Sequence, residues 1–375
     1  MIDANNSNAA PDPRASDVES TEPKPKLTEV RYEHTANFAE VMERVGGTLL
    51  ISTYQAGKLV VVGVHEHSLA FSFHAFEQVM GLAVSPNRIA VGSRRAIYLL
   101  RRAAELGPRI EPPGRYDDCF LTRLAHVTGA IHVHEMAWGN DELWIVNTLF
   151  SCLCTLDSDS SFVPRWKPPF ISNLAGEDRC HLNGLAMDAG RPRYVTALAE
   201  VDTPAGWRPT KAQTGCLIDV DTGQTIARGL AMPHSPRVHE GRIWLLDSGR
   251  GRLGIIEADS GKLDTVIELP GYTRGLVFYG PLAFVGLSRI RETSVFGGLP
   301  LEERRDQLKC GVAVVDTRTA QIIAQLEFGS GVEEIFDVKL LPGVRLPAVS
   351  GPDPQADGTP MLWLAAQPRW LPGVH

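Results

Sequence analysis

Short hydrophobic runs alternate with turn residues along almost the whole chain. Runs such as TLLIST, KLVVVGV, RIAVGS, LWIVNT and RIWLLDS are rich in Val, Ile, Leu and aromatic residues, and Gly, Pro, Asn or Asp bounds them. Such runs are typical of β-strands separated by tight turns. Helix-like patterns are confined to two short segments, 37–45 and 299–308, and the second indicates an insertion between strands. The pattern predicts an all-β protein.

The hydrophobic runs also repeat. Six strands open with a segment that resembles Gly-Leu-Ala, and further strands follow the first five of them; the openings are Gly81, Glu135, Gly184, Arg237, Gly275 and Asp337. A spacing of roughly 50 residues with several short strands per unit is typical of a β-propeller. We therefore predict a six-bladed β-propeller.

The two ends of the chain are expected to share one blade. The strand that opens at Asp337 has no clear partners downstream, and the runs at 48–73 have no opening strand. Strands from both chain ends would close the ring and remove exposed sheet edges. This gives three segments: a polar, disordered leader at 1–28, a propeller at 29–350, and a C-terminal tail at 351–375 that could pack on the propeller.

The composition and net charge of the chain argue against some classes of binding partner. The chain has 375 residues with 37 basic and 44 acidic side chains, a net charge of -7. This balance argues against nucleic acid, which requires clustered Lys and Arg. No apolar stretch approaches the roughly 20 residues that span a bilayer, and no secretory signal is present. The six cysteines show no disulfide spacing. We expect a cytoplasmic protein with no membrane contact.

Candidate chemistry gathers where the opening strands begin. In a propeller these strands line the central channel, and the residues just before them lie at its mouth. Three residues before each opening lies an outer row: Gln78, His132, His181, His234, Tyr272 and Glu334. One residue before each opening lies an inner row: Met80, His134, Asn183, Pro236, Arg274 and Phe336.

The outer row suggests a metal centre. His132, His181 and His234, with Glu334, would come from separate blades and meet near the axis. Imidazole suits Fe, Zn, Cu, Ni or Mn, whereas Ca²⁺ prefers oxygen ligands. Three His and one carboxylate would leave open positions for water, O₂ or substrate. We predict a divalent transition metal, with Fe(II) favoured and Zn or Mn as alternatives.

Other polar residues of the two rows receive supporting roles. His134, Tyr272 and Arg274 are the candidate catalytic residues. His134 would move a proton or act as a fourth nitrogen ligand, and Tyr272 and Arg274 would fix the substrate, Arg274 by a bidentate contact. Asn183 and Gln78 would also contact the substrate, which is a small molecule or a peptide. The sequence contains no nucleophile elbow, phosphate-binding loop or paired CxxC motif, and it identifies no protein partner.

Three segments carry a family resemblance: HVHEMAWGNDELWIVNT, CHLNGLAMDAGRPRYVTAL and MPHSPRVHEGRIWLLDSGRG. They resemble an uncharacterised bacterial family of conserved hypothetical propellers over about residues 35–350, which implies the fold but no activity. Asn183-Gly184-Leu185-Ala186 is also similar to a motif of gluconolactonase-like six-bladed propellers, in which the Asn binds a divalent metal. The acidic ligands of those enzymes are replaced here by His134, Pro236 and Arg274. The outer row further resembles the four-His Fe(II) site of carotenoid-cleavage propellers, a likeness of fold alone.

Three functions remain open at this point. The first is a metal-dependent oxidoreductase or oxygenase. The second is a metal-dependent lactonase-type hydrolase, in which His134 moves the proton of a metal-bound water. The third is a non-catalytic propeller that binds a ligand or a protein at its mouth, with structural histidines.

Overall fold

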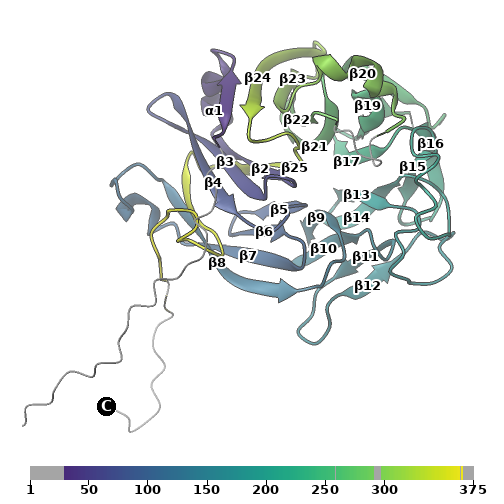
Figure 1. The fold of residues 1–375 in the computed structure, drawn as a ribbon, viewed down its shortest axis with the longest axis horizontal. Coiled ribbons are helices and arrows are strands. Elements are labelled where there is room, and N and C mark those ends of the chain that lie inside the picture. The colour runs from purple at the N-terminus through teal and green to yellow at the C-terminus, as the bar shows by residue number, and fades with distance from the viewer. Residues whose placement is uncertain (1–28, 258, 291–296, 364, 366–375) are drawn as a thin grey trace, which may run out of the picture.

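The computed structural model describes residues 29–257, 259–290, 297–363 and 365 (Figure 1). In this part of the chain the strands form six mainly antiparallel sheets, arranged as blades around a central axis (Figure 1). The predicted six-bladed β-propeller is confirmed. The leader at 1–28 lies outside the described residues.

Each blade has its innermost strand at the axis (Figure 1). From the axis outwards, one blade contains β5 (Leu82–Ser85), β6 (Arg88–Gly92), β7 (Ala96–Arg102), β8 (Asp118–Val127) and β26 (Pro347–Ser350). The next contains β9 (Val133–Gly139), β10 (Glu142–Asn147), β11 (Cys152–Thr155) and β12 (Val163–Trp166). It is followed by β13 (Leu182–Asp188), β14 (Arg191–Ala197), β15 (Gly215–Asp219) and β16 (Thr225–Leu230).

The remaining blades complete the ring. One contains β17 (Pro233–His239), β18 (Arg242–Asp247), β19 (Arg252–Ile256) and β20 (Leu263–Glu268). Another contains β21 (Tyr272–Tyr279), β22 (Leu282–Ser288), β23 (Gly311–Asp316), β24 (Gln321–Ser330) and β1 (Arg31–His34). The last combines both chain ends, with β25 (Asp337–Pro342) innermost and β2 (Gly47–Thr53), β3 (Lys58–His65) and β4 (Ser68–Ala75) outside it. This is the shared blade that the sequence predicts.

Polar side chains on the innermost strands join one blade to the next. Each accepts a hydrogen bond from a backbone N–H of the neighbouring blade: Glu135 from Leu185 at 2.9 Å, Ser235 from Gly275 at 3.1 Å, and Asp337 from Leu82 at 2.9 Å. Space at these crossings is tight, since a Cβ on Gly275 would lie 2.4 Å from the backbone nitrogen of Val338. The Asp337 contact also fastens the blade that holds both chain ends.

Helix α1 and the C-terminal segment pack against the blades. Helix α1 (Phe38–Val45) buries Phe38, Val41 and Met42 in a hydrophobic cluster with the blade sheets, and its chain leaves through Gly46 in the left-handed region. The described residues also contain three 3₁₀ helices, namely η1 (Gly107–Arg109), η2 (Ser248–Arg250) and η3 (Pro300–Gln307), the last being the predicted insertion. In the C-terminal segment, the carboxylate of Asp357 accepts a hydrogen bond from the backbone of Ala75 at 2.7 Å.

Two further findings concern the whole described region. All six cysteines are buried as free thiols. None of the helices in the described ranges has the length and apolar character that a bilayer span requires.

Candidate functional site

Four blades enter the channel through the same unusual backbone conformation. Gln78, His132, His181 and Met232 all have a positive φ, between 49 and 56°. Non-glycine residues rarely adopt this left-handed region. His132, His181 and Met232 each lie one residue before the innermost strand of their blade, so they occupy equivalent positions. Met232, rather than His234, therefore corresponds to His132 and His181.

The strand pairing confirms this register and corrects the sequence alignment. Val133 pairs with Asn147, Leu182 with Ala197, and Pro233 with Asp247, at the same place in three blades. The prediction that His234 shares a row with His132 and His181 is thus wrong by two residues. It arose because PHSPRV lacks a Gly-Leu-Ala opening, so Arg237 was aligned with Gly184 in place of Ser235.

The corrected rows keep most of the expected residues. The inner row is Met80, His134, Asn183, His234, Arg274 and Phe336, and the outer row is Gln78, His132, His181, Met232, Tyr272 and Glu334. His234 now lies beside His134 on the inner row, which places two imidazoles deep in the mouth.

A cavity of about 370 Å³ lies at this mouth. Its lining combines apolar and aromatic side chains with a few polar groups: Tyr54, Met80, His132, His134, Asp178, His181, Trp207, Arg208, Met232, His234, Tyr272, Arg274, Glu334 and Phe336. A mostly apolar cavity of about 300–1,000 Å³ with a few convergent polar groups is the usual form of a small-molecule site.

His134 is the centre of the cluster. Its ring centroid lies 5.2 Å from that of His181 and 5.3 Å from that of His234. Arg274 Nη2 lies 2.8 Å from His134 Nε2, and because a guanidinium only donates, Nε2 must accept. Burial, and then the charge of Arg274, hold the pKa of His134 well below its ordinary value of 6.5. The imidazole is therefore neutral near pH 7.

His234 has both ring nitrogens engaged. Nδ1 lies 2.8 Å from the carbonyl oxygen of Met232, which can only accept, so Nδ1 carries the proton. Nε2 then accepts from the Asn183 amide at 3.3 Å, and the Asn183 carbonyl accepts from the Thr196 hydroxyl at 2.6 Å. Burial lowers the pKa of His234 well below 6.5. Asn183 thus positions His234 and does not itself line the cavity.

His181 is held differently, by a carboxylate. Its Nδ1 lies 3.0 Å from each oxygen of Asp178. The indole Nε1 of Trp207 donates to Asp178 at 3.1 Å, and the Trp207 ring packs 4.4 Å from that of His181. Trp207 and Arg208 come from the long connection between β14 and β15, which covers one side of the cavity.

Arg274 is a buried cation with little compensation. Its guanidinium carbon lies 3.3 Å from the centroid of the Phe336 ring, and Nη1 lies 3.5 Å from Glu334 Oε1. Nε has no hydrogen-bond partner among the described residues. Burial lowers the pKa of Arg274, which shows that the charged form is poorly stabilised here.

The structure brings together most, though not all, of the predicted site residues. His132, His134, His181, His234, Tyr272, Arg274 and Glu334 line the cavity, whereas Gln78 and Asn183 do not. Tyr272 is buried with its hydroxyl 3.5 Å from His234 Nδ1. Sequence reasoning missed Asp178 and Trp207; an acidic residue three positions before His181 was the available signal.

The predicted metal ligands do not form a ligand set. Across residues 29–257, 259–290, 297–363 and 365, no group of three or more His, Cys, Asp or Glu side chains is arranged to hold a metal. Both nitrogens of His234 are engaged, and Glu334 faces Arg274. The metal centre stays a prediction, which elemental analysis of anaerobically purified protein tests.

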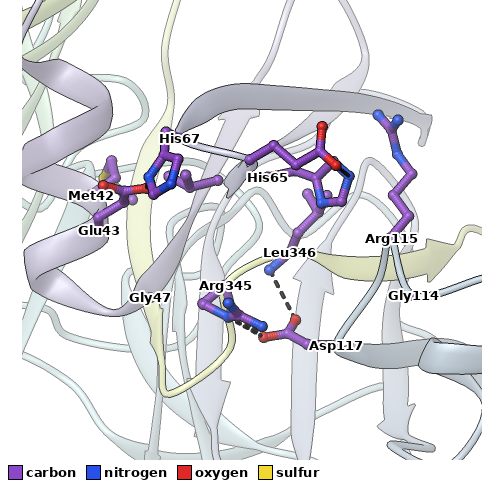
Figure 2. Close-up of a pocket in the computed structure, with 12 residues that line it drawn as sticks. Met42, Glu43, Gly47, His65, His67, Gly114, Arg115, Asp117, Arg345 and Leu346 are labelled. Atoms are coloured by element: carbon purple, nitrogen blue, oxygen red, sulfur yellow. Dashed lines mark hydrogen bonds and ion pairs between the residues drawn. The ribbon is translucent and has the colours of Figure 1, made fainter.

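A second, outer cavity of about 500 Å³ lies away from the channel (Figure 2). Figure 2 shows His67 beside Glu43, and Arg345 beside Asp117. The His67 Nδ1 lies 2.8 Å from Glu43 Oε1, and the Arg345 Nε lies 3.4 Å from Asp117 Oδ2. Three of these four side chains are exposed and Asp117 is half-buried, and none of the described residues that line this cavity has a buried polar side-chain atom without a hydrogen-bond partner.

Comparison with known proteins identifies the fold. Residues 36–349 match the model of a family described as "Domain of unknown function (DUF4915)". No curated protein matches the chain. A chain from the nidogen–laminin complex is similar over 79% of this chain and 99% of its own, with 10% identity and a TM-score of 0.52.

Two further solved structures are more distantly similar. A protein of unknown function from Bacteroides caccae is 9% identical over 79% of this chain and 98% of its own, with a TM-score of 0.49. A streptogramin B lyase is 12% identical over 74% of each chain, with a TM-score of 0.40. At 10% identity the likeness to the nidogen–laminin chain concerns the fold alone, and the two TM-scores below 0.5 support no conclusion about this chain.

Proposed function

Because this chain belongs to the DUF4915 family, whose description names no activity, we propose a function from the cavity itself. The protein binds a small organic carboxylate with an apolar, preferably aromatic body at the mouth of the propeller channel. The observation that carries this proposal is the buried guanidinium of Arg274.

Arg274 supports anion binding because its charge is not fully compensated. Its described contacts are a neutral imidazole, a carboxylate 3.5 Å away and an aromatic face. A buried charge is costly unless it is paired with good geometry. A guanidinium offers five N–H donors, in a fork that matches a carboxylate. A ligand carboxylate would add the missing short, charge-assisted hydrogen bonds.

The remaining lining supports an apolar body on that ligand. Met80, Trp207, Met232, Tyr272 and Phe336 surround the imidazoles. Removing a phenyl or branched aliphatic group from water contributes about 25 cal/mol per Å² buried. The mouth is therefore suited to an amphipathic molecule with its acid group at Arg274.

The test compares phenylacetate with its neutral analogue phenylacetamide by calorimetry and thermal shift. The native protein is expected to bind phenylacetate at least about tenfold more tightly, as one charge-assisted hydrogen bond predicts. Arg274→Met should remove this preference, and Arg274→Lys should keep only part of it. Arg228→Gln, which changes an exposed arginine on β16, is the control. Equal affinity for the acid and the amide, or no response to phenylacetate, benzoate and 3-phenylpropionate, contradicts the proposal.

The metal-dependent oxidoreductase and the metal-dependent lactonase remain predictions without a ligand set in the described residues. Stoichiometric Fe, Zn or Mn in the native protein, lost in His181→Ala with the fold retained, would revive them. The ligand-binding function proposed above requires no metal ion.

A further inference from the structure

The strongest feature that anion binding does not use is the pair formed by His181 and Asp178. We propose that His181, oriented by Asp178, acts as a general base that activates water for the hydrolysis of a carboxylic ester bound in the cavity. The proposal rests on the carboxylate site described above, because the acid released by such a reaction is the kind of anion that Arg274 would receive.

The geometry fixes which nitrogen of His181 can act. A carboxylate only accepts, so the Nδ1 that faces both Asp178 oxygens at 3.0 Å carries the proton of the neutral imidazole. The lone pair then resides on Nε2, for which the described residues supply no hydrogen-bond partner. An imidazole with one nitrogen held by a carboxylate and the other bare is the arrangement that general-base catalysis requires.

Asp178 is itself held in place. Trp207 Nε1 donates to Oδ2 at 3.1 Å, and the backbone N–H of Asp178 donates to the carbonyl of Leu149 at 2.8 Å. The indole also packs on the His181 ring at 4.4 Å. The base is therefore fixed from two sides before any ligand enters, as preorganised catalysis demands.

The lining favours water as the nucleophile. None of the described residues that line the cavity is Ser, Thr, Cys or Lys. Tyr272 is poorly suited, because burial raises the pKa of its phenol and its hydroxyl faces His234. A base without a side-chain nucleophile acts on a bound water or on a proton of the ligand.

Arg274 would receive the charge that develops on the ester. It bonds to His134, whose ring lies 5.2 Å from that of His181, so the base and the cation flank one imidazole. As the water oxygen bonds to the carbonyl carbon, His181 Nε2 takes a water proton and the carbonyl electrons move to the oxygen near Arg274. The tetrahedral intermediate then expels the alkoxide, which takes the proton back from His181. Ester and water become acid and alcohol.

The experiment measures hydrolysis of 4-nitrophenyl phenylacetate, whose acid product is phenylacetate. We expect turnover by the native protein above the buffer rate, without a burst of nitrophenolate, because no acyl-enzyme forms. His181→Gln should lower kcat/KM by at least about 100-fold, and Asp178→Asn by about 10- to 100-fold, mainly through kcat. Both variants should still bind phenylacetate.

The control is His67→Gln, since His67 forms a similar pair with Glu43 at 2.8 Å outside the channel. It should leave hydrolysis within about twofold. Imidazole ¹⁵N NMR supplies a second readout: the native protein should show His181 protonated on Nδ1, and Asp178→Asn should change that tautomer. Native protein that binds phenylacetate but does not hydrolyse the ester, or variants with unchanged turnover, would overturn the general base. Equal affinity of the native protein for phenylacetate and phenylacetamide would instead overturn the carboxylate site.

Discussion

Each of the two cavities contains a histidine–carboxylate pair and an arginine–carboxylate pair. The pairs of the channel mouth are largely buried, whereas those of the outer cavity are largely exposed. In the channel mouth, His181 and Asp178 are 3.0 Å apart with side chains 18% and 14% exposed. In the outer cavity, His67 and Glu43 are 2.8 Å apart and 91% and 36% exposed. Distance alone does not separate a site from a surface contact. The mouth pair is fixed by Trp207 and shielded from solvent, whereas the outer pair is free to exchange with water.

The arginines repeat this contrast. Arg274 and Glu334 are 3.5 Å apart and 8% and 11% exposed, while Arg345 and Asp117 are 3.4 Å apart and 75% and 27% exposed. Solvent screens the outer pair and stabilises each charge separately. In the mouth, the 3.5 Å contact with Glu334 compensates the buried charge of Arg274 only partly, because burial shields that charge from solvent. We infer that burial, rather than pairing, makes the mouth the functional region.

The largest expected effect concerns pH. Burial lowers the pKa values of His134 and His234, so the folded protein leaves both neutral where the unfolded chain, below about pH 6.5, takes up two protons. Proton binding to the unfolded chain lowers stability as pH falls, by up to about 1.4 kcal/mol per pH unit for each imidazole. In urea titrations between pH 7.5 and 5, His234→Gln should leave stability near pH 7.5 on the same slope and reduce the slope below about pH 6 by about that amount. If the unfolding free energies of the native protein and of His234→Gln depend on pH with the same slope, burial in the mouth does not keep His234 neutral.

The next effect tests the hydrogen bonds behind the cavity. Asn183→Ala removes the partner of both His234 Nε2 and the Thr196 hydroxyl, which are buried. Leaving such groups unsatisfied costs about 1–3 kcal/mol. We expect about 2 kcal/mol less unfolding free energy by urea denaturation, against less than about 0.5 kcal/mol for the exposed Asn173→Ala. Equal losses would remove the distinction between mouth and surface.

The fold was predictable because many independent runs agree. Hydrophobic runs, turn residues and a period near 50 residues together predict six blades, and Asp337 without downstream partners predicts the shared blade. The family match and the six sheets confirm the expected uncharacterised propeller family. Each observation repeats several times along the chain, so one misread strand does not change the result.

The site was less predictable because it depends on single positions. A register error of two residues at Pro233 moved His234 to the wrong row, since no Gly-Leu-Ala opening marks that strand. The partners of each imidazole, such as Trp207 on a long connection, have no periodic signal at all. Which histidines line the mouth followed from the repeats, whereas what each ring nitrogen contacts required the structure.

A smaller effect isolates the support of the base. Trp207→Phe removes the indole donor to Asp178 but keeps an aromatic ring beside His181. Loss of one hydrogen bond of about 1 kcal/mol predicts about fivefold slower ester hydrolysis, mainly through kcat. Trp244→Phe is the matched control, because that buried indole has no hydrogen-bond partner among the described residues. A similar loss of turnover in both variants would mean that ring volume matters and the Asp178 contact does not.

The smallest effect belongs to the outer cavity. His67→Gln and Arg345→Gln each remove one member of an exposed pair, and such pairs contribute about 0–1 kcal/mol. Together they should change the unfolding free energy by less than about 1 kcal/mol and leave phenylacetate binding unaltered. The two exposed pairs have nearly the same atom-to-atom distances as the two pairs of the mouth. The double variant therefore measures how much solvent exposure weakens the contribution of such pairs to stability. A loss as large as that of Asn183→Ala would show that the outer cavity, too, depends on its ionic contacts, and burial could no longer distinguish the two regions.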